Sequence, residues 1–188
     1  KEPAIDDVAA LDKASAENLA NLQTIASKLK KSYSFTQLGT HTVGKKVFAK
    51  IGIQGESLLK IHSNSFKAPY AVDHICWHGG TLYQLDNILH SGGLLGGGNL
   101  RNGSVPEAVL GRKDKDMAMG SCYCEGIVYE LRFVGELKNY DSVRNKLCKE
   151  DWRAEHCTKH GLGLNRPKES FVYLNEESTT LLALHIQI

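Results

Sequence analysis

The sequence predicts an α+β domain in which strands dominate the second half of the chain. Two patterns point to this class. An amphipathic helical pattern opens the chain, and short runs of β-branched and aromatic residues recur up to the C-terminus. With 188 residues, of which 41% are hydrophobic, the chain can bury one substantial core but not two. We therefore expect a core over residues 71–188, with residues 1–70 packed against it as an N-terminal helix and β-hairpin region.

The first expected element is a helix over residues 7–31. Its apolar residues recur mostly at intervals of three and four, with acidic residues at the start and lysines at the end, as the helix dipole favours. Over residues 33–61 the apolar pattern then breaks into shorter, strand-like pieces at 47–53 and 57–61, which are separated by glycines. This spacing predicts small β-hairpins.

The most informative stretch is residues 76–81, which read Cys-Trp-His-Gly-Gly-Thr. Residues 72–77 are typical of a buried strand, and residues 81–90 carry one apolar helical stripe that ends before Gly92. We predict that the strand ends at His78 and that a His-Gly-Gly turn leads into the helix. Because glycine lacks a Cβ, a ligand can approach the backbone amides of such a turn closely. This is a candidate ligand site.

A glycine-rich stretch follows at residues 92–103 and predicts a mobile loop. It lacks the lysine and hydroxyl ending of a P-loop, and no dinucleotide-binding glycine fingerprint follows a strand, so both nucleotide folds are disfavoured. Further strands are expected at residues 126–134, 171–174 and 181–188, with a partly helical segment at 143–156.

The charge and the cysteine content limit which classes of partner and which cellular compartment the sequence predicts. A net charge of +2 without long like-charge blocks argues against nucleic acid as a partner, and no apolar run is long enough to predict a membrane span. The five cysteines favour a reducing compartment, because their number is odd and Cys122 and Cys124 are too close for an ordinary disulfide. A zinc site at Cys122, Cys124, His156 and Cys157 fits no standard ligand spacing, so no metal is expected.

Taken together, residues 72–188 resemble the catalytic domain of ADP-ribosyltransferases of the poly(ADP-ribose) polymerase and diphtheria-toxin branch. In that family a strand ends in His-Gly followed by a hydroxyl residue, and the next helix ends in Ile-Leu-x-x-Gly. His78-Gly79 and residues 88–92 reproduce both motifs at the family spacing. Gly80 departs from the pattern because the hydroxyl residue, Thr81, comes one position later.

Five later segments resemble family elements in the family's order. Residues 121–124 are similar to the segment whose tyrosine stacks on nicotinamide, and residues 134–137 to the Glu-Val-Ala-Leu-Gly strand. Residues 160–163 are similar to a Lys-Gly-Leu-Gly loop, 169–173 to the catalytic glutamate strand, and 181–186 to the closing strand. The resemblance implies a split β-sandwich of two antiparallel sheets with flanking helices.

The resemblance also implies a site for NAD, which is a substrate here. His78 would bond the ribose hydroxyls, and the backbone of Gly79 would pair with the nicotinamide carboxamide. Tyr123 would stack on the pyridine ring, and Glu169 would stabilise the positive charge that develops on the ribose. The remaining candidates are Gly80, Thr81 and Ser121 for binding NAD, and Glu177, Glu125 and Glu176 as alternative catalytic carboxylates.

The implied activity is mono-ADP-ribosylation: one ADP-ribose passes from NAD to a protein acceptor and nicotinamide is released. A compact catalytic unit with an unfamiliar N-terminal region suits a bacterial toxin or secreted effector acting on a host protein, such as ubiquitin, in the host cytosol. The alternatives are an NAD glycohydrolase and a tRNA 2′-phosphotransferase of the same fold. A catalytically inactive binding module is a third, favoured by Gly80 and by the lack of an aromatic residue near Val109.

Overall fold

The computed structural model describes residues 7–58, 72–95, 108–120, 124–140, 142 and 171–188. The helices are α1 (Asp7–Lys28), η2 (Leu82–Gln84), α2 (Leu85–Ser91), α3 (Lys115–Met119) and η5 (Glu176–Ser178), where η denotes a 3-10 helix. The strands are β1 (Tyr33–Val43), β2 (Lys46–Gly55), β3 (Asp73–Thr81), β4 (Ala108–Gly111), β5 (Gly126–Val134), β6 (Lys138–Asn139), β7 (Val172–Asn175) and β8 (Thr179–Gln187).

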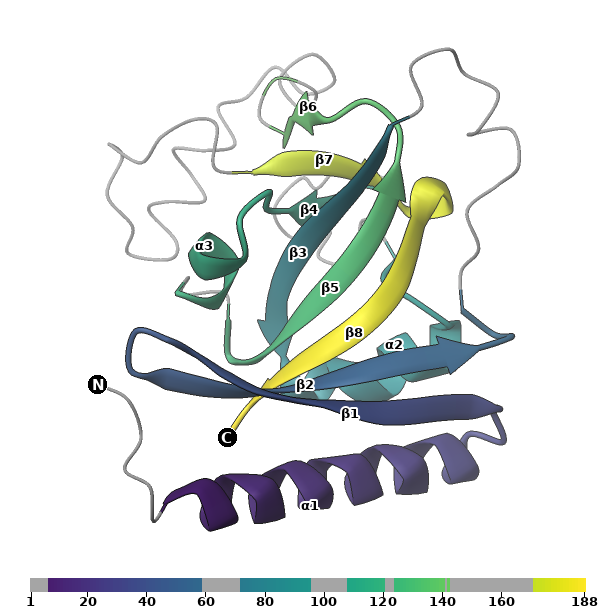
Figure 1. Cartoon of the computed structure of the whole chain (residues 1–188). Coiled ribbons are helices and arrows are strands. Elements are labelled where there is room, and N and C mark those ends of the chain that lie inside the picture. Colours follow the sequence, from purple (N-terminus) through teal and green to yellow (C-terminus); the bar gives the residue numbers. More distant parts are fainter. Residues whose placement is uncertain (1–6, 59–71, 96–107, 121–123, 141, 143–170) are drawn as a thin grey trace.

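The described strands form two antiparallel sheets. The larger has the order β1-β2-β8-β5-β3 and the smaller the order β4-β7-β6. Figure 1 shows β3, β5 and β8 crossing the centre of the molecule, with the small sheet behind their upper ends. The fold is α+β with two antiparallel sheets, as predicted.

The N-terminal region folds as a long helix and a hairpin. Figure 1 shows α1 running along β1, and Leu22 of α1 is only 1% exposed in the main core. Gly44, with φ +60°, and Lys45 form the two-residue turn between β1 and β2, a pattern typical of a type II′ turn. The strand predicted at residues 57–61 is wrong in its described part, because Ser57 and Leu58 follow β2 in a turn.

The hairpin belongs to the same sheet as the C-terminal strand. Phe48 of β2 is the partner of Gln187 of β8, and the pairing continues to Gly52 and Ala183. Beyond β8, the Ile188 N–H donates to the Val47 carbonyl over 2.9 Å. The β2–β8 ladder therefore joins a strand of the N-terminal region, residues 1–70, to the C-terminal strand of the core.

The side chains of strand β5 alternate between the two faces of the large sheet. Ile127, Tyr129 and Leu131 point into the main core, which also contains Leu85 and Leu89 from α2. The alternate residues, among them Val128 and Glu130, lie on the opposite face. There Val128 packs in a second, smaller cluster with Phe48, Ala118, Met119 and Cys124, so that α3 covers part of this face.

The segment after β5 differs from its prediction. Residues 134–137 were expected to form a strand, but β5 ends at Val134 and residues 135–137 turn toward β6. At that point the Gly135 N–H donates to the Val72 carbonyl over 3.1 Å, which closes the β3–β5 ladder. The chain then leaves the large sheet for the small one.

No helix in the described part of the chain is both long and apolar enough to cross a membrane.

Candidate active site

The His-Gly-Gly-Thr motif lies inside a strand. We predicted a turn after His78, but β3 continues to Thr81, and these residues pair in register with Tyr129, Val128, Ile127 and Gly126 of β5. The prediction of the turn is wrong because β5 supplies backbone partners along the whole motif. The helix that follows does begin and end near the predicted positions, with Gly92 as its left-handed cap at φ +84°.

The second glycine of the motif is explained by packing. A Cβ on Gly80 would lie 3.0 Å from Gln84 Oε1 and 3.2 Å from Tyr129 Cε2. The ring of Tyr129 occupies the space beside the Gly80 backbone. A hydroxyl residue at this position would displace the ring or Gln84.

His78 is held in one tautomer. Its Nδ1 lies 2.6 Å from the carbonyl oxygen of Leu110, and because a carbonyl only accepts, Nδ1 carries the proton. Desolvation of the ring lowers the pKa of His78 below its usual 6.5, against the opposing effect of this hydrogen bond. The imidazole is therefore neutral at pH 7, and Nε2 is an acceptor suited to a hydroxyl donor.

The backbone of Gly79 points toward the edge of β3 that lies away from β5. Two hydrogen bonds join the backbone of Trp77 to Arg112, at 2.9 and 2.7 Å, on the side of β3 away from β5. Alternate residues of a strand direct their N–H and C=O groups to the same edge. Gly79 thus presents one donor and one acceptor to that edge, and no described residue forms a backbone hydrogen bond with it there.

This edge is where the two sheets meet. Leu110 and Arg112, which bond His78 and Trp77, lie on β4 and directly after it, and β4 pairs with β7 of the small sheet. The buried guanidinium of Arg112 lies 3.7 Å from the ring centre of Phe171, the residue directly before β7. The motif on β3 is therefore joined through β4 to the strand that follows Glu169 in sequence.

Tyr129 lies across the ladder from His78, with the two ring centres 6.2 Å apart. The residue is fully buried, and its hydroxyl has no hydrogen-bond partner among the described residues. Burial raises the pKa of Tyr129, so the hydroxyl stays protonated. A buried hydroxyl without a partner lowers stability.

Tyr129→Phe is accordingly expected to leave the free energy of unfolding unchanged or to raise it by about 1 kcal/mol. Urea unfolding followed by circular dichroism measures this, with Tyr83→Phe as the control because Tyr83 is 95% exposed. A loss of stability for Tyr129→Phe alone would mean that the hydroxyl has a partner in the folded chain.

The candidate carboxylates occupy different places. Glu125 lies beside the motif: its N–H donates to the Gly80 carbonyl over 2.9 Å, and it bridges to Thr81. Glu177 is exposed on η5, which leads into Thr179, the partner of Phe133. Phe133 lies four residues, or about 13 Å, along β5 from Tyr129, which is the partner of His78 on β3. The structure thus brings Glu125, rather than Glu177 or its neighbour Glu176, next to the motif.

Three predicted site residues, Ser121, Tyr123 and Glu169, lie outside the described residues. So do Cys122, His156 and Cys157 of the considered zinc set, while Cys124 is buried as a free thiol. Among the described residues, no three His, Cys, Asp or Glu side chains lie together as a metal site. Burial raises the pKa of Cys124, and that of Cys76 to about 11, so both thiols are protonated at neutral pH.

Sequence reasoning missed the contributions of Leu110, Arg112 and Tyr129. The Leu110 carbonyl carries no side-chain signal, and Arg112 follows an apolar run like any strand-terminal arginine. Tyr129 fits the strand pattern without indicating what lies opposite. Comparison of the chain with protein families, with curated proteins and with solved structures found no match.

Proposed function

We propose that this protein is an NAD-dependent mono-ADP-ribosyltransferase that transfers ADP-ribose to a protein acceptor and releases nicotinamide. The observation that carries the proposal is the edge of β3 at Gly79, where the Gly79 N–H and C=O have no backbone partner among the described residues. A primary carboxamide, such as that of nicotinamide, has one acceptor oxygen and a donor nitrogen, which complement the N–H and C=O that Gly79 directs to this edge.

The neighbouring groups suit the rest of the substrate. The Nε2 acceptor of neutral His78 fits a ribose hydroxyl, as expected for this family. The two antiparallel sheets that meet at β3 agree with the split sandwich implied by the resemblance. In this proposal Tyr123 stacks on nicotinamide, Ser121 and Thr81 line the site, and Glu169 acts on the ribose.

Transfer of ADP-ribose requires a carboxylate near the ribose and a leaving group that is held in place. When the glycosidic bond to nicotinamide breaks, positive charge develops on the ribose, and a nearby carboxylate stabilises it. The bonds to the carboxamide hold the leaving group in place while a nucleophile on the acceptor approaches the opposite face of the sugar. No metal is needed for this step.

Incubation with NAD labelled in its ADP-ribose part tests the proposal. We expect nicotinamide release and label on a protein of a host-cell lysate, both lost in His78→Ala and retained in His74→Ala. His74 lies on the same strand, stacked on Phe133, which makes it a matched control. Circular dichroism establishes that each variant is folded.

The same assay separates the alternatives. Release of nicotinamide without label on protein would identify a glycohydrolase, and consumption of a 2′-phosphorylated tRNA would identify the phosphotransferase. If the folded wild-type protein neither binds nor consumes NAD, the transferase proposal is wrong and a binding module remains.

A further inference from the structure

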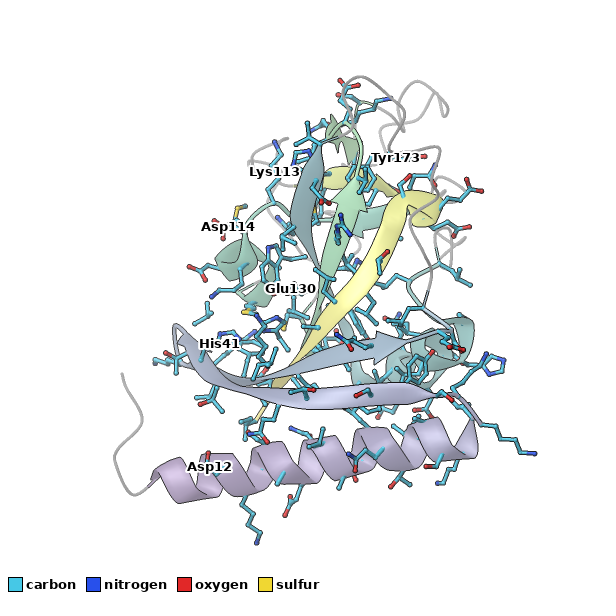
Figure 2. The ribbon with its side chains drawn as sticks, turned by 45° about the vertical axis from the view of Figure 1, so that its right-hand side comes forward. Asp12, His41, Lys113, Asp114, Glu130 and Tyr173 are labelled. Atoms are coloured by element: carbon cyan, nitrogen blue, oxygen red, sulfur yellow. The ribbon has the colours of Figure 1, made fainter. Side chains whose placement is uncertain are left out.

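A chain of three hydrogen-bonded ionisable side chains crosses the face of the large sheet opposite His78. His41 Nε2 of β1 lies 2.8 Å from His185 Nδ1 of β8, and His185 Nε2 lies 3.2 Å from Glu130 Oε1 of β5. His185 is only 2% exposed. In Figure 2, His41 and Glu130 lie on the same side of the sheet. The proposed transferase reaction uses none of the three.

The proton positions in this chain follow from its acceptors. The hydrogen bond from His185 is the largest cause that lowers the pKa of Glu130, so the carboxylate is ionised and accepts the His185 Nε2 proton. With the proton of His185 on Nε2, its Nδ1 is an acceptor, and His41 donates to it from Nε2. His41 Nδ1 is left as a buried lone pair without a partner among the described residues.

The surroundings of His41 disfavour a second proton on its ring. The ring stacks on Phe48, with centres 5.6 Å apart, and it meets the edge of His185 at 5.0 Å. Burial is the largest cause that lowers the pKa of His41 to about 4, followed by the positive charge that His185 of β8 carries when its ring is doubly protonated. The charged groups that also act on it are Lys50 of β2 and Lys115 and Asp116 of α3, with only Asp116 opposing the shift.

The same contacts fasten the turn of the hairpin to the rest of the fold. His41 lies three residues before Gly44, and Lys46, on the other side of the turn, donates to the Met119 carbonyl at the end of α3 over 3.1 Å. His185 in turn contacts the edge of Trp77 on β3, with ring centres 5.3 Å apart. The hairpin is thereby tied to β8, β5 and α3 on one face.

We propose that the Glu130–His185–His41 chain is an acid-sensitive latch that holds the turn of the β1–β2 hairpin against β8 and α3. With His41 neutral, the chain is complete. A proton on His41 Nδ1 adds a buried donor with no described acceptor and a positive charge near Lys50 and Lys115. This donor and this charge reach water only when the hairpin turn opens, so acid favours opening of the turn while β5 stays paired with β3.

This inference does not depend on the transferase activity. Nitrogen NMR of the histidine rings in the full chain tests the proton positions directly. We expect a protonated Nε2 and a bare Nδ1 on His41 that persist well below pH 6. Protonation of His41 Nδ1 above pH 6 would overturn the latch.

Hydrogen exchange tests the opening itself. After correction for intrinsic rates, amides of residues 40–42 are expected to exchange at least about tenfold faster at pH 4.5 than at pH 7, whereas those of β5 change less. In His41→Gln, which keeps a donor for His185 but does not titrate, this increase is expected to disappear, and in the control His90→Gln to persist. Equal acceleration of β5, or the same increase in His41→Gln, would overturn the proposal.

Discussion

Glu169→Gln is expected to lower nicotinamide release from NAD about 100-fold or more while the fold and NAD binding remain. Glutamine has nearly the same shape as glutamate but lacks its negative charge, so it cannot stabilise the positive charge of the transition state. The ground-state substrate loses little, because its ribose carries no such charge. Single-turnover release of labelled nicotinamide measures the rate, and calorimetric titration measures NAD binding.

Two matched variants make this result decisive. Glu177→Gln and Glu125→Gln remove a carboxylate from η5 and from the position beside Gly80. If Glu169 carries the reaction, neither changes release by more than about tenfold. A large loss for Glu125→Gln with an active Glu169→Gln would instead transfer the catalytic role to the carboxylate that the structure places next to the motif.

Gly92→Ala is expected to lower the free energy of unfolding by about 3 kcal/mol or more. Gly92 caps α2 with φ +84°, a conformation that alanine disfavours. In addition, a Cβ at this position would lie 1.7 Å from the Ser57 carbonyl oxygen, so the turn after β2 has to move. Urea unfolding measures the loss.

Gly44→Ala separates backbone strain from the clash. Gly44 also has a positive φ, +60°, but a Cβ there would have no neighbour within 4 Å. We expect a loss of about 1 kcal/mol, which is the strain alone. Equal losses for the two variants would show that the contact between Gly92 and Ser57 adds nothing to stability.

The positions of helices and strands were predicted best where the residue types follow the burial pattern of a helix or a strand. The helix α1, the strand β5 and the cap at Gly92 match their predicted positions within a few residues. Each carries a local signal: a period of three to four residues, a continuous run of β-branched and aromatic residues, or a glycine after an apolar stripe. Residues 134–137 carried a weaker signal, and there the chain turns out of the sheet.

The candidate site was predicted only in part. The sequence singled out His78, Gly79 and Gly80, but it placed them in a turn. Two consecutive glycines are typical of a turn, and only the pairing with β5 keeps them extended. The Leu110 carbonyl that holds the imidazole comes from 32 residues away, and nothing local in the sequence indicates it.

By itself the sequence determined the α+β class and the long first helix and singled out the candidate motif at residues 78–81, because residue types and their periodicity are local properties. Only the tertiary structure decided which edge Gly79 faces, which glutamate lies beside Gly80, and that His41 meets His185 and Glu130. These are consequences of strand order and register. His41 and His185 stand 144 residues apart, and their contact depends on β8 pairing with β2 and β2 with β1.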